Sequence, residues 1–326
     1  MKAVLCKEYG PPESLVIEDI ASPTPGRGQV VVSVKACGVN FPDTLIIQGK
    51  YQFKPAMPFS PGSEVSGIVK EVGEGVDTVR VGDHIIAFTG WGGFAEEVVT
   101  EASKLITLPG EIDFVTAAAF TLVYGTAHHA LKDRAQIKAG ETLLVLGAAG
   151  GVGLASVELG KVMGARVIAA ASSAEKLAVC KQHGADELID YTTEDLRERI
   201  KALTQGNGVD VIIDPLGGAY SEPALRSIAW NGRFLVIGFA AGDIPRIPLN
   251  LALLKGCAIV GVFWGSFTER EPRHNRENLH ELLNWLAQGK LKPHIFETYP
   301  LEGAAQALND VLNRKVKGKA VLLTNS

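Results

Sequence analysis

The chain has 326 residues, and its 32 lysines and arginines against 36 aspartates and glutamates give a formal net charge of −4. At about 100–200 residues per domain, this length predicts two domains. A net-negative chain is a poor match to general nucleic-acid binding, so we expect no nucleic-acid partner. With 46% hydrophobic and 21% charged residues, the composition excludes a disordered chain.

The cysteines and the N-terminal segment indicate the compartment. Four cysteines are scattered along the chain without a C-x-x-C pair, which excludes a four-thiolate zinc lobe. The first residues carry charges and prolines where a signal peptide needs an apolar core. The apolar stretches are too short or too rich in glycine to span a bilayer. We therefore expect a cytoplasmic protein that has no membrane partner.

The first 120 residues or so predict a mostly β region. Runs rich in β-branched residues indicate strands over 30–39, 65–73 and 84–88. Glycine and proline separate these runs, as they do at turns between short strands.

From Thr142 onward, apolar strands alternate with helical segments. The predicted strands cover 142–148, 166–171, 187–190, 210–214, 233–238 and 258–263. The predicted helices between them cover 152–163, 174–183, 193–204, 220–228 and 250–255. Near-continuous apolar strands joined by such crossovers predict a parallel sheet covered on both faces.

After Pro272 the pattern changes again. An amphipathic helix is predicted over 277–288, followed by a strand at 295–299, a helix at 303–313 and a last strand at 319–323. The parallel-sheet block is therefore predicted to lie between two parts of one β-rich domain.

A glycine-rich turn follows the first strand of the alternation. Residues 147–153 read Gly-Ala-Ala-Gly-Gly-Val-Gly and lie before a predicted helix, as a dinucleotide-binding turn requires. Ala149, Gly150, Gly151 and Val152 would bring backbone amides and a helix N-terminus to a pyrophosphate. A tight turn without a ligand is the alternative.

The end of the second strand of this block indicates which dinucleotide binds. A site for NAD has Asp or Glu here, which binds the ribose 2′-hydroxyl. This chain has Ser172 and Ser173, with Lys176 one turn later, and these residues suit a 2′-phosphate. The pattern predicts NADPH, with plain helix capping by the serines as the alternative.

Several motifs together resemble those of one known family. They are 38–43 (Gly-Val-Asn-Phe-Pro-Asp), 61–67 (Pro-Gly-Ser-Glu-Val-Ser-Gly), 81–83 (Val-Gly-Asp), the turn at 147–153, Asp190-Tyr191 and Gly318-Lys319. The chain resembles the zinc-free quinone oxidoreductase (zeta-crystallin-like) family of the medium-chain dehydrogenase/reductase superfamily.

The resemblance implies an α/β fold with two domains. A doubly wound, parallel-sheet Rossmann domain that binds NADPH would cover 123–290. A β-rich, GroES-like catalytic domain would combine 1–122 with 291–326. The active site would be the cleft between them, at the carboxyl ends of the parallel strands. A homodimer is also implied, through pairing of sheet edges near 258–264.

The resemblance also implies a reaction without metal. Zinc-dependent relatives carry Cys where Asn40 stands and His where Ser63 stands, and neither Asn nor Ser is a usual zinc ligand. The implied activity is NADPH-dependent reduction of a quinone or another α,β-unsaturated carbonyl compound.

Without a Lewis acid, a protein group must donate a hydrogen bond to the substrate oxygen. Tyr51 resembles the tyrosine that related enoyl reductases place over the substrate, and Asn40 is the second candidate. The alternatives are a lid aromatic for Tyr51 and a turn residue for Asn40. By resemblance, Asn40 is also a cofactor contact, and further cofactor contacts fall on Thr126, Tyr191, Phe239, Phe263 and Arg314. A helix cap is the alternative for Thr126, a strand-end aromatic for Tyr191 and a solvated basic cluster for Arg314.

Two other functions stay open. Arg270, Arg273 and Arg276 would share a face if helical and could meet the phosphates of an acyl-CoA, as in an enoyl-thioester reductase. A solvated helix that begins at Pro272 is the alternative for this run. Some relatives are lens crystallins or bind RNA, which would make the chain a non-catalytic NADPH-binding protein.

His128 and His129 point about 100° apart on a helix and are predicted to be structural.

Overall fold

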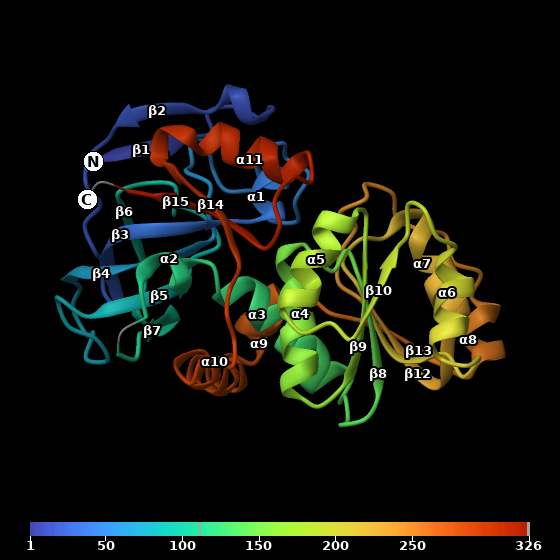
Figure 1. The fold of residues 1–326 in the computed structure, drawn as a ribbon. Helices are drawn as coiled ribbons and strands as arrows, with labels where there is room; N and C mark the ends of the chain where they lie inside the picture. The colour runs from blue at the N-terminus through green and yellow to red at the C-terminus, as the bar shows by residue number, and fades with distance from the viewer. Residues whose placement is uncertain (111, 325–326) are drawn as a thin grey trace. The chain divides into compact units, whose positions relative to one another are not determined.

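We describe a computed structural model of the chain, which covers residues 1–110 and 112–324. The chain folds into two compact units (Figure 1). The first unit combines Met1–Leu122 with the segment that begins at Pro293, and the second unit is Val123–Lys292.

The first unit contains a seven-stranded sheet. Its order is β14-β15-β3-β4-β5-β7, with β6 also paired to β3. The pairs are antiparallel except for β14 and β15. The strands are β3 (Gln29–Val39), β4 (Glu64–Val72), β5 (His84–Phe88), β6 (Glu97–Glu101), β7 (Leu105–Thr107), β14 (Ile295–Pro300) and β15 (Lys319–Leu323). A second, two-stranded sheet consists of β1 (Lys2–Leu5) and β2 (Val16–Asp19).

Short helices complete the first unit. They are α1 (Phe41–Ile46), α2 (Phe114–Ala118) and α11 (Ala304–Leu312), with 3-10 turns at Pro12–Ser14, Ala102–Lys104 and Leu301–Gly303. Helix α11 contacts α1 and β15, whereas α2 contacts β3 and β4. The core lies along β3 because this central strand pairs with three neighbours and buries all of its valines.

The second unit contains a six-stranded, fully parallel sheet of order β10-β9-β8-β11-β12-β13. Its strands are β8 (Thr142–Leu146), β9 (Arg166–Ala171), β10 (Glu187–Asp190), β11 (Val209–Asp214), β12 (Ile228–Val236) and β13 (Ala258–Gly261). The central strands are buried along nearly their whole length, which requires cover on both faces.

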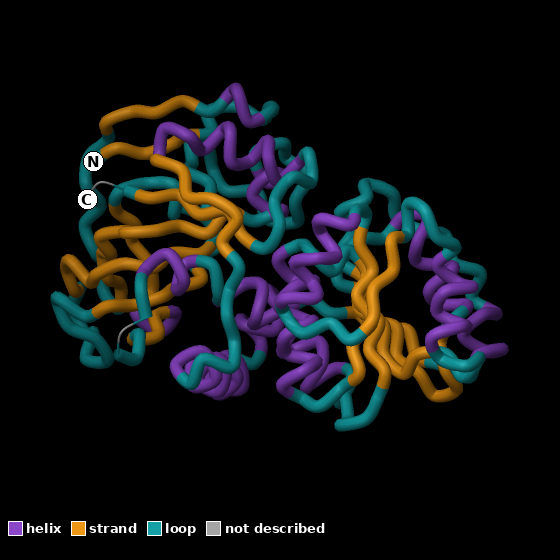
Figure 2. Tube along the Cα trace, viewed as in Figure 1, coloured by secondary structure: helices purple, strands orange, loops and turns teal. Residues whose placement is uncertain are grey.

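Helices supply this cover. In Figure 2 the strands of the second unit stand between two groups of helices. Helices α4 (Gly151–Val162) and α5 (Ala174–Gln182) lie on one face. Helices α6 (Leu196–Leu203), α7 (Ser221–Arg226) and α8 (Asn250–Lys255) lie on the other, and a 3-10 turn, Gly218–Tyr220, precedes α7. The predicted fold class, a doubly wound parallel sheet plus a β-rich part, is confirmed.

Other helices of the second unit precede and follow the sheet. Helix α3 (Thr121–His128) begins in the first unit and runs into a π-helical turn, His129–Arg134. Helix α9 (Trp264–Arg270) and helix α10 (Pro272–Ala287) follow β13. Leu279, Leu282 and Leu283 form the buried stripe of α10.

Three elements begin well away from the first residue predicted for them. Helix α6 begins at Leu196 rather than at residue 193 because the Asp195 side chain accepts a hydrogen bond from Glu198 N at 2.9 Å and caps it. Strand β12 begins at Ile228, inside the predicted 220–228 helix. Helix α10 begins at Pro272, five residues earlier than predicted.

The break before α10 corrects the prediction for the three arginines. Arg270 ends α9, whereas Arg273 and Arg276 belong to α10, so the three do not share one helical face. Arg273 instead contacts Glu277 at 3.2 Å. Pro272 begins the helix, as the alternative proposed.

Within the described residues, no helix is both long and apolar enough to cross a membrane.

Candidate functional site

The glycine-rich turn joins β8 to α4. Gly150, which has no side chain to cap the helix, is the N-cap residue of α4. A Cβ atom on Gly153 would lie 2.3 Å from Gly147 O, so glycine is required for the helix to pack against the turn. A Cβ atom on Gly150 would lie 3.4 Å from the same oxygen and would fill the approach to the turn.

The turn also lies where the strand order reverses. Strand β8 is flanked by β9, which follows it, and by β11, to which the chain returns after β10. In open parallel sheets, ligands bind at such a point, outside the carboxyl ends of the strands. Ala149, Gly150, Gly151 and Val152 are located there, and they fit the pyrophosphate of a dinucleotide.

The end of β9 carries a hydroxyl–ammonium pair. Lys176 Nζ donates to Ser172 Oγ at 3.1 Å. Ser173 caps α5, because its side chain accepts a hydrogen bond from Lys176 N at 3.3 Å. The capping alternative therefore holds for Ser173, whereas Ser172 and Lys176 form a polar pair that suits a phosphate.

The other predicted cofactor contacts in the second unit lie in different places. Tyr191 follows β10, and its ring centroid is 4.3 Å from that of Tyr220. Both tyrosines line a groove of about 630 Å³ beside α6 and α7. Phe239 lies in the loop after β12, and the exposed Phe263 precedes α9. The turn, the Ser172–Lys176 pair and Tyr191 thus follow the adjacent strands β8, β9 and β10.

The simplest alternative is wrong for Thr126 but agrees with the exposure of Arg314. Thr126 is buried inside α3, so it does not cap the start of a helix. Arg314 belongs to the first unit and is exposed after α11 with a φ angle of 57°. The neighbouring basic residues are not uniformly solvated, since Lys319 is buried, whereas Lys315 is exposed and pairs with Asp310 at 3.0 Å.

In the first unit, Asn40 lies in a buried polar network. It is the N-cap residue of α1, and its backbone N donates to Asp43 Oδ2 at 2.8 Å. Its side-chain Nδ2 donates to Gly38 O and to Glu64 Oε2, each at 3.2 Å. Both amide hydrogens are therefore engaged inside the unit, which leaves no donor for a substrate oxygen.

Sequence reasoning missed two members of this network. Lys319 Nζ donates to Asn40 Oδ1 at 2.5 Å and to Glu64 Oε2 at 3.1 Å. Glu64 also accepts a hydrogen bond from Leu122 N at 2.7 Å. Glu64 and Lys319 each stand at the first position of an apolar strand in a family motif, and this was the available signal.

Burial changes the proton affinity of two nearby groups. Burial raises the pKa of Asp43 to about 7, although the Asn40 hydrogen bond and the Lys319 charge act in the opposite direction. Burial, and to a lesser degree the Asp43 charge, also raises the pKa of the Tyr51 phenol. Tyr51 therefore keeps its O–H throughout the neutral range and stays a hydrogen-bond donor.

The positions that hold zinc in the zinc-dependent relatives have a different donor set here. The Asn40 side chain is hydrogen-bonded to Gly38, Glu64 and Lys319. The buried Ser63 Oγ is without a hydrogen-bond partner among the described residues. Across residues 1–110 and 112–324, no three His, Cys, Asp or Glu side chains gather as a metal site would require.

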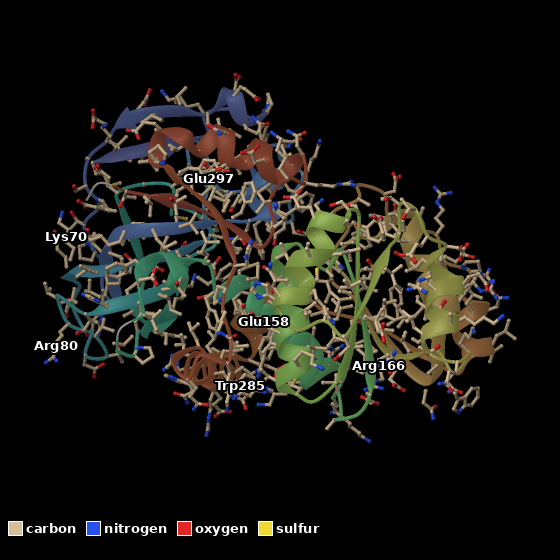
Figure 3. All side chains as sticks on the ribbon, in the orientation of Figure 1. Lys70, Arg80, Glu158, Arg166, Trp285 and Glu297 are labelled. Atoms are coloured by element: carbon tan, nitrogen blue, oxygen red, sulfur yellow. The ribbon has the colours of Figure 1, made fainter. Side chains whose placement is uncertain are left out.

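The two adjacent histidines bind different partners, in agreement with a structural role. His128 Nε2 contacts Glu281 at 2.8 Å, and its ring lies 5.7 Å from that of Trp285. Trp285 is labelled on α10 in Figure 3. His129 Nδ1 contacts Asp133 at 2.7 Å.

Comparison with known proteins gives consistent relatives over the whole chain. Residues 26–110 match the alcohol dehydrogenase GroES-like domain, and residues 151–288 match the zinc-binding dehydrogenase family. A quinone oxidoreductase-like protein 2 homolog of Nematostella vectensis is 43% identical, over 99% of this chain and 89% of that protein.

Solved structures agree with this result. The quinone oxidoreductase of Pseudomonas syringae pv. Tomato DC3000 has a TM-score of 0.93 at 34% identity, with 99% of both chains covered. The Escherichia coli quinone oxidoreductase, solved in complex with NADPH, has a TM-score of 0.92 at 30% identity. That match covers 99% of this chain and 100% of the other.

Proposed function

Since the chain belongs to the quinone oxidoreductase family of the medium-chain dehydrogenase/reductase superfamily, we propose that it transfers hydride from NADPH to a quinone or another α,β-unsaturated carbonyl compound without zinc. The family makes it a nicotinamide-dependent oxidoreductase. The preference for NADPH, the class of acceptor and the independence from zinc are the parts that we propose.

The Ser172–Lys176 pair at the end of β9 is the observation that carries this proposal. A ribose 2′-phosphate would find an ammonium and a hydroxyl there, whereas a carboxylate suited to a free 2′-hydroxyl is not at this position. The glycine turn would hold the pyrophosphate, and Tyr191 would face the adenosine side. Thr126, Phe239, Phe263 and Arg314 are proposed as further cofactor contacts.

Tyr51 is proposed as the donor to the acceptor's oxygen. When bound, the reduced nicotinamide supplies a hydride to an electron-poor carbon, and negative charge then develops on the conjugated oxygen. The Tyr51 O–H can donate a hydrogen bond to that oxygen and release its proton there. Asn40, whose amide hydrogens are engaged, keeps a positioning role at the start of α1.

Oxidation of NADPH in the presence of different acceptors tests the function. The panel consists of 1,2-quinones, 1,4-quinones, 2-alkenals and crotonyl-CoA, each measured with and without a strong chelator. We expect turnover with quinones or alkenals that the chelator leaves unchanged. Turnover with crotonyl-CoA alone would identify an enoyl-thioester reductase, and tight NADPH binding without any turnover would identify a binding protein.

The cofactor preference can be tested at Lys176. We expect Lys176→Ala to weaken NADPH binding by about 1–3 kcal/mol, because a charge-assisted hydrogen bond to the 2′-phosphate is lost. NADH lacks this phosphate, so its affinity stays the same. Calorimetric titration with both cofactors measures the difference.

Lys181 provides the matched control, since it lies on the same helix and donates to Asp186 O at 3.3 Å. Lys181→Ala is expected to bind both cofactors like the wild type. A wild-type protein that binds NADH more tightly than NADPH would contradict the assignment.

We also propose a homodimer that forms through β13. This strand is an edge of the parallel sheet, and its Ile259 side chain is exposed. Large apolar side chains of the preceding segment are exposed as well: Ile244, Leu249, Leu253 and Leu254. An uncovered apolar edge strand is a template for pairing with another strand, and a second copy would cover it.

Ile259→Glu tests this interface. A two-fold dimer would bring the two carboxylates close together in an apolar contact, so we expect the dimer to dissociate at least about a hundredfold more readily. Sedimentation velocity over a concentration series measures the association. Val81→Glu, at an exposed apolar residue of the first unit, should leave it unchanged. A monomeric wild type would refute the dimer, and a dimeric Ile259→Glu variant would place the interface elsewhere.

A further inference from the structure

The ammonium group of Lys319 is enclosed by oxygen atoms. The Lys319 side chain is 4% exposed, although it carries a charge. Its Nζ lies 2.5 Å from Asn40 Oδ1, 3.1 Å from Glu64 Oε2 and 3.3 Å from Val39 O. An ammonium has three hydrogens and no acceptor, so each hydrogen finds one oxygen.

Three central strands bring these groups together. Lys319 begins β15, whose next residue, Ala320, pairs with Val39 of β3. Glu64 begins β4 and pairs with Gly38 of β3. A Cβ atom on Gly38 would lie 2.7 Å from Glu64 Oε2 and 3.1 Å from Lys319 Nζ, so a side chain here would fill the place of the ion pair.

The pair also compensates a buried charge. Glu64 is fully buried, and a carboxylate without a counter-ion in such a place costs several kcal/mol. The hydrogen bonds from Leu122 N and Asn40 Nδ2 satisfy its lone pairs but bring no positive charge. Lys319 supplies that charge.

The same ammonium determines how the Asn40 side chain is oriented. Because an ammonium only donates, the atom 2.5 Å from it must be the carboxamide oxygen. The amide nitrogen then faces Gly38 O and Glu64 Oε2, which is the arrangement seen.

We infer that the oxygens of Asn40, Glu64 and Val39 form a small cation site that Lys319 fills from within the chain, and that the tethered cation makes Lys319 a positioning residue for Asn40. Removal of the side chain is therefore expected to leave a site for a small primary ammonium ion. The inference about Asn40 extends the proposed function, whereas the cation site is independent of it.

A thermodynamic cycle tests the charge. Lys319→Met keeps most of the volume without the charge, and we expect it to raise the unfolding constant at least about a hundredfold, as measured in urea. The double variant Lys319→Met, Glu64→Gln removes both charges and should recover most of this loss. If Lys319→Met is as stable as the wild type, or if the double variant is no more stable than the single one, Lys319 does not act as the counter-ion of Glu64.

Chemical complementation tests the site itself. Lys319→Ala lacks the atoms of propylammonium, so saturating propylammonium chloride is expected to lower its unfolding constant at least about tenfold relative to sodium chloride at equal ionic strength. The neutral 1-propanol and the bulky tetramethylammonium ion should not do so, and the wild type should respond to none of them. Equal stabilisation by 1-propanol would show that only volume matters, and no stabilisation by propylammonium would overturn the site.

The positioning role has its own readout, independent of activity. The Asn40 side-chain amide hydrogens, identified by their loss in Asn40→Ala, should exchange slowly with solvent in the wild type because both are bonded to buried oxygens. In folded Lys319→Met, which keeps Gly38 O and Glu64 Oε2 as acceptors, we expect their exchange to be at least about tenfold faster. Unchanged protection would refute the positioning role, and none of these measurements depends on the proposed reduction.

Discussion

Tyr51→Phe is expected to lower kcat for 2-alkenals at least about a hundredfold. The change removes the O–H that we propose as donor to the developing negative charge, and a single such donor supplies an effect of this size. The ring and its contact with Phe53, at a centroid distance of 5.9 Å, remain. NADPH affinity should therefore stay unchanged, as fluorescence titration can show.

The size of the decrease in kcat of Tyr51→Phe should depend on the acceptor. Quinones accept hydride with less help than alkenals, because they are more electrophilic, so kcat for quinones should fall less. The matched control is Tyr9→Phe, since the Tyr9 ring packs beside Gly49, two residues before Tyr51. Wild-type kcat on both acceptors in Tyr51→Phe would make Tyr51 a wall of the site rather than a donor.

Asp43→Asn should change how stability depends on pH. The pKa of Asp43 is raised from 3.8 to about 7, so between these values the folded protein holds a proton that the unfolded chain has lost. The stabilisation due to Asp43 is thus fully present below about pH 4 and is lost as the pH rises through 7. Relative to the wild type, the asparagine variant should gain about 3 kcal/mol between pH 5 and pH 8.

Urea unfolding at the two pH values measures this change. Asn at position 43 still offers an oxygen to the Asn40 N–H, so the hydrogen bond at the start of α1 can remain. Asp77→Asn, at an exposed carboxylate of the same unit, should follow the wild type at both pH values. If the Asp43→Asn curve parallels the wild type, Asp43 is ionised in the folded protein at both pH values.

Local signals in the sequence predicted the parallel sheet and the glycine turn. Short, mostly apolar runs that stand between helical segments have few alternatives, so strands β8, β9 and β11 lie close to their predicted positions. The turn is easy to recognise in the sequence because position 153 must be glycine: a Cβ atom there would clash with the backbone oxygen of Gly147. The lack of an acid after β9 could likewise be seen without a structure.

Other features depend on tertiary structure and could not be predicted. Whether Lys319 is solvated or buried depends on the register of β15 against β3, which no local pattern encodes. The donor capacity of Asn40 depends on Glu64, which begins a different strand, as well as on its sequence neighbour Gly38. The shared helical face predicted for the three arginines was wrong because a single residue, Glu271, separates α9 from α10.

The position of β15 has a consequence for synthesis on the ribosome. This strand pairs with the central strand β3, yet more than 270 residues, the entire second unit included, separate the two in the sequence. The second unit is continuous and can fold as it emerges, whereas the first must wait for a late segment. Until Lys319 is translated, the antiparallel pair of β3 and β4 has Glu64 without its counter-ion. Chaperones would therefore meet this part of β3 as an open sheet edge for most of the time that translation takes.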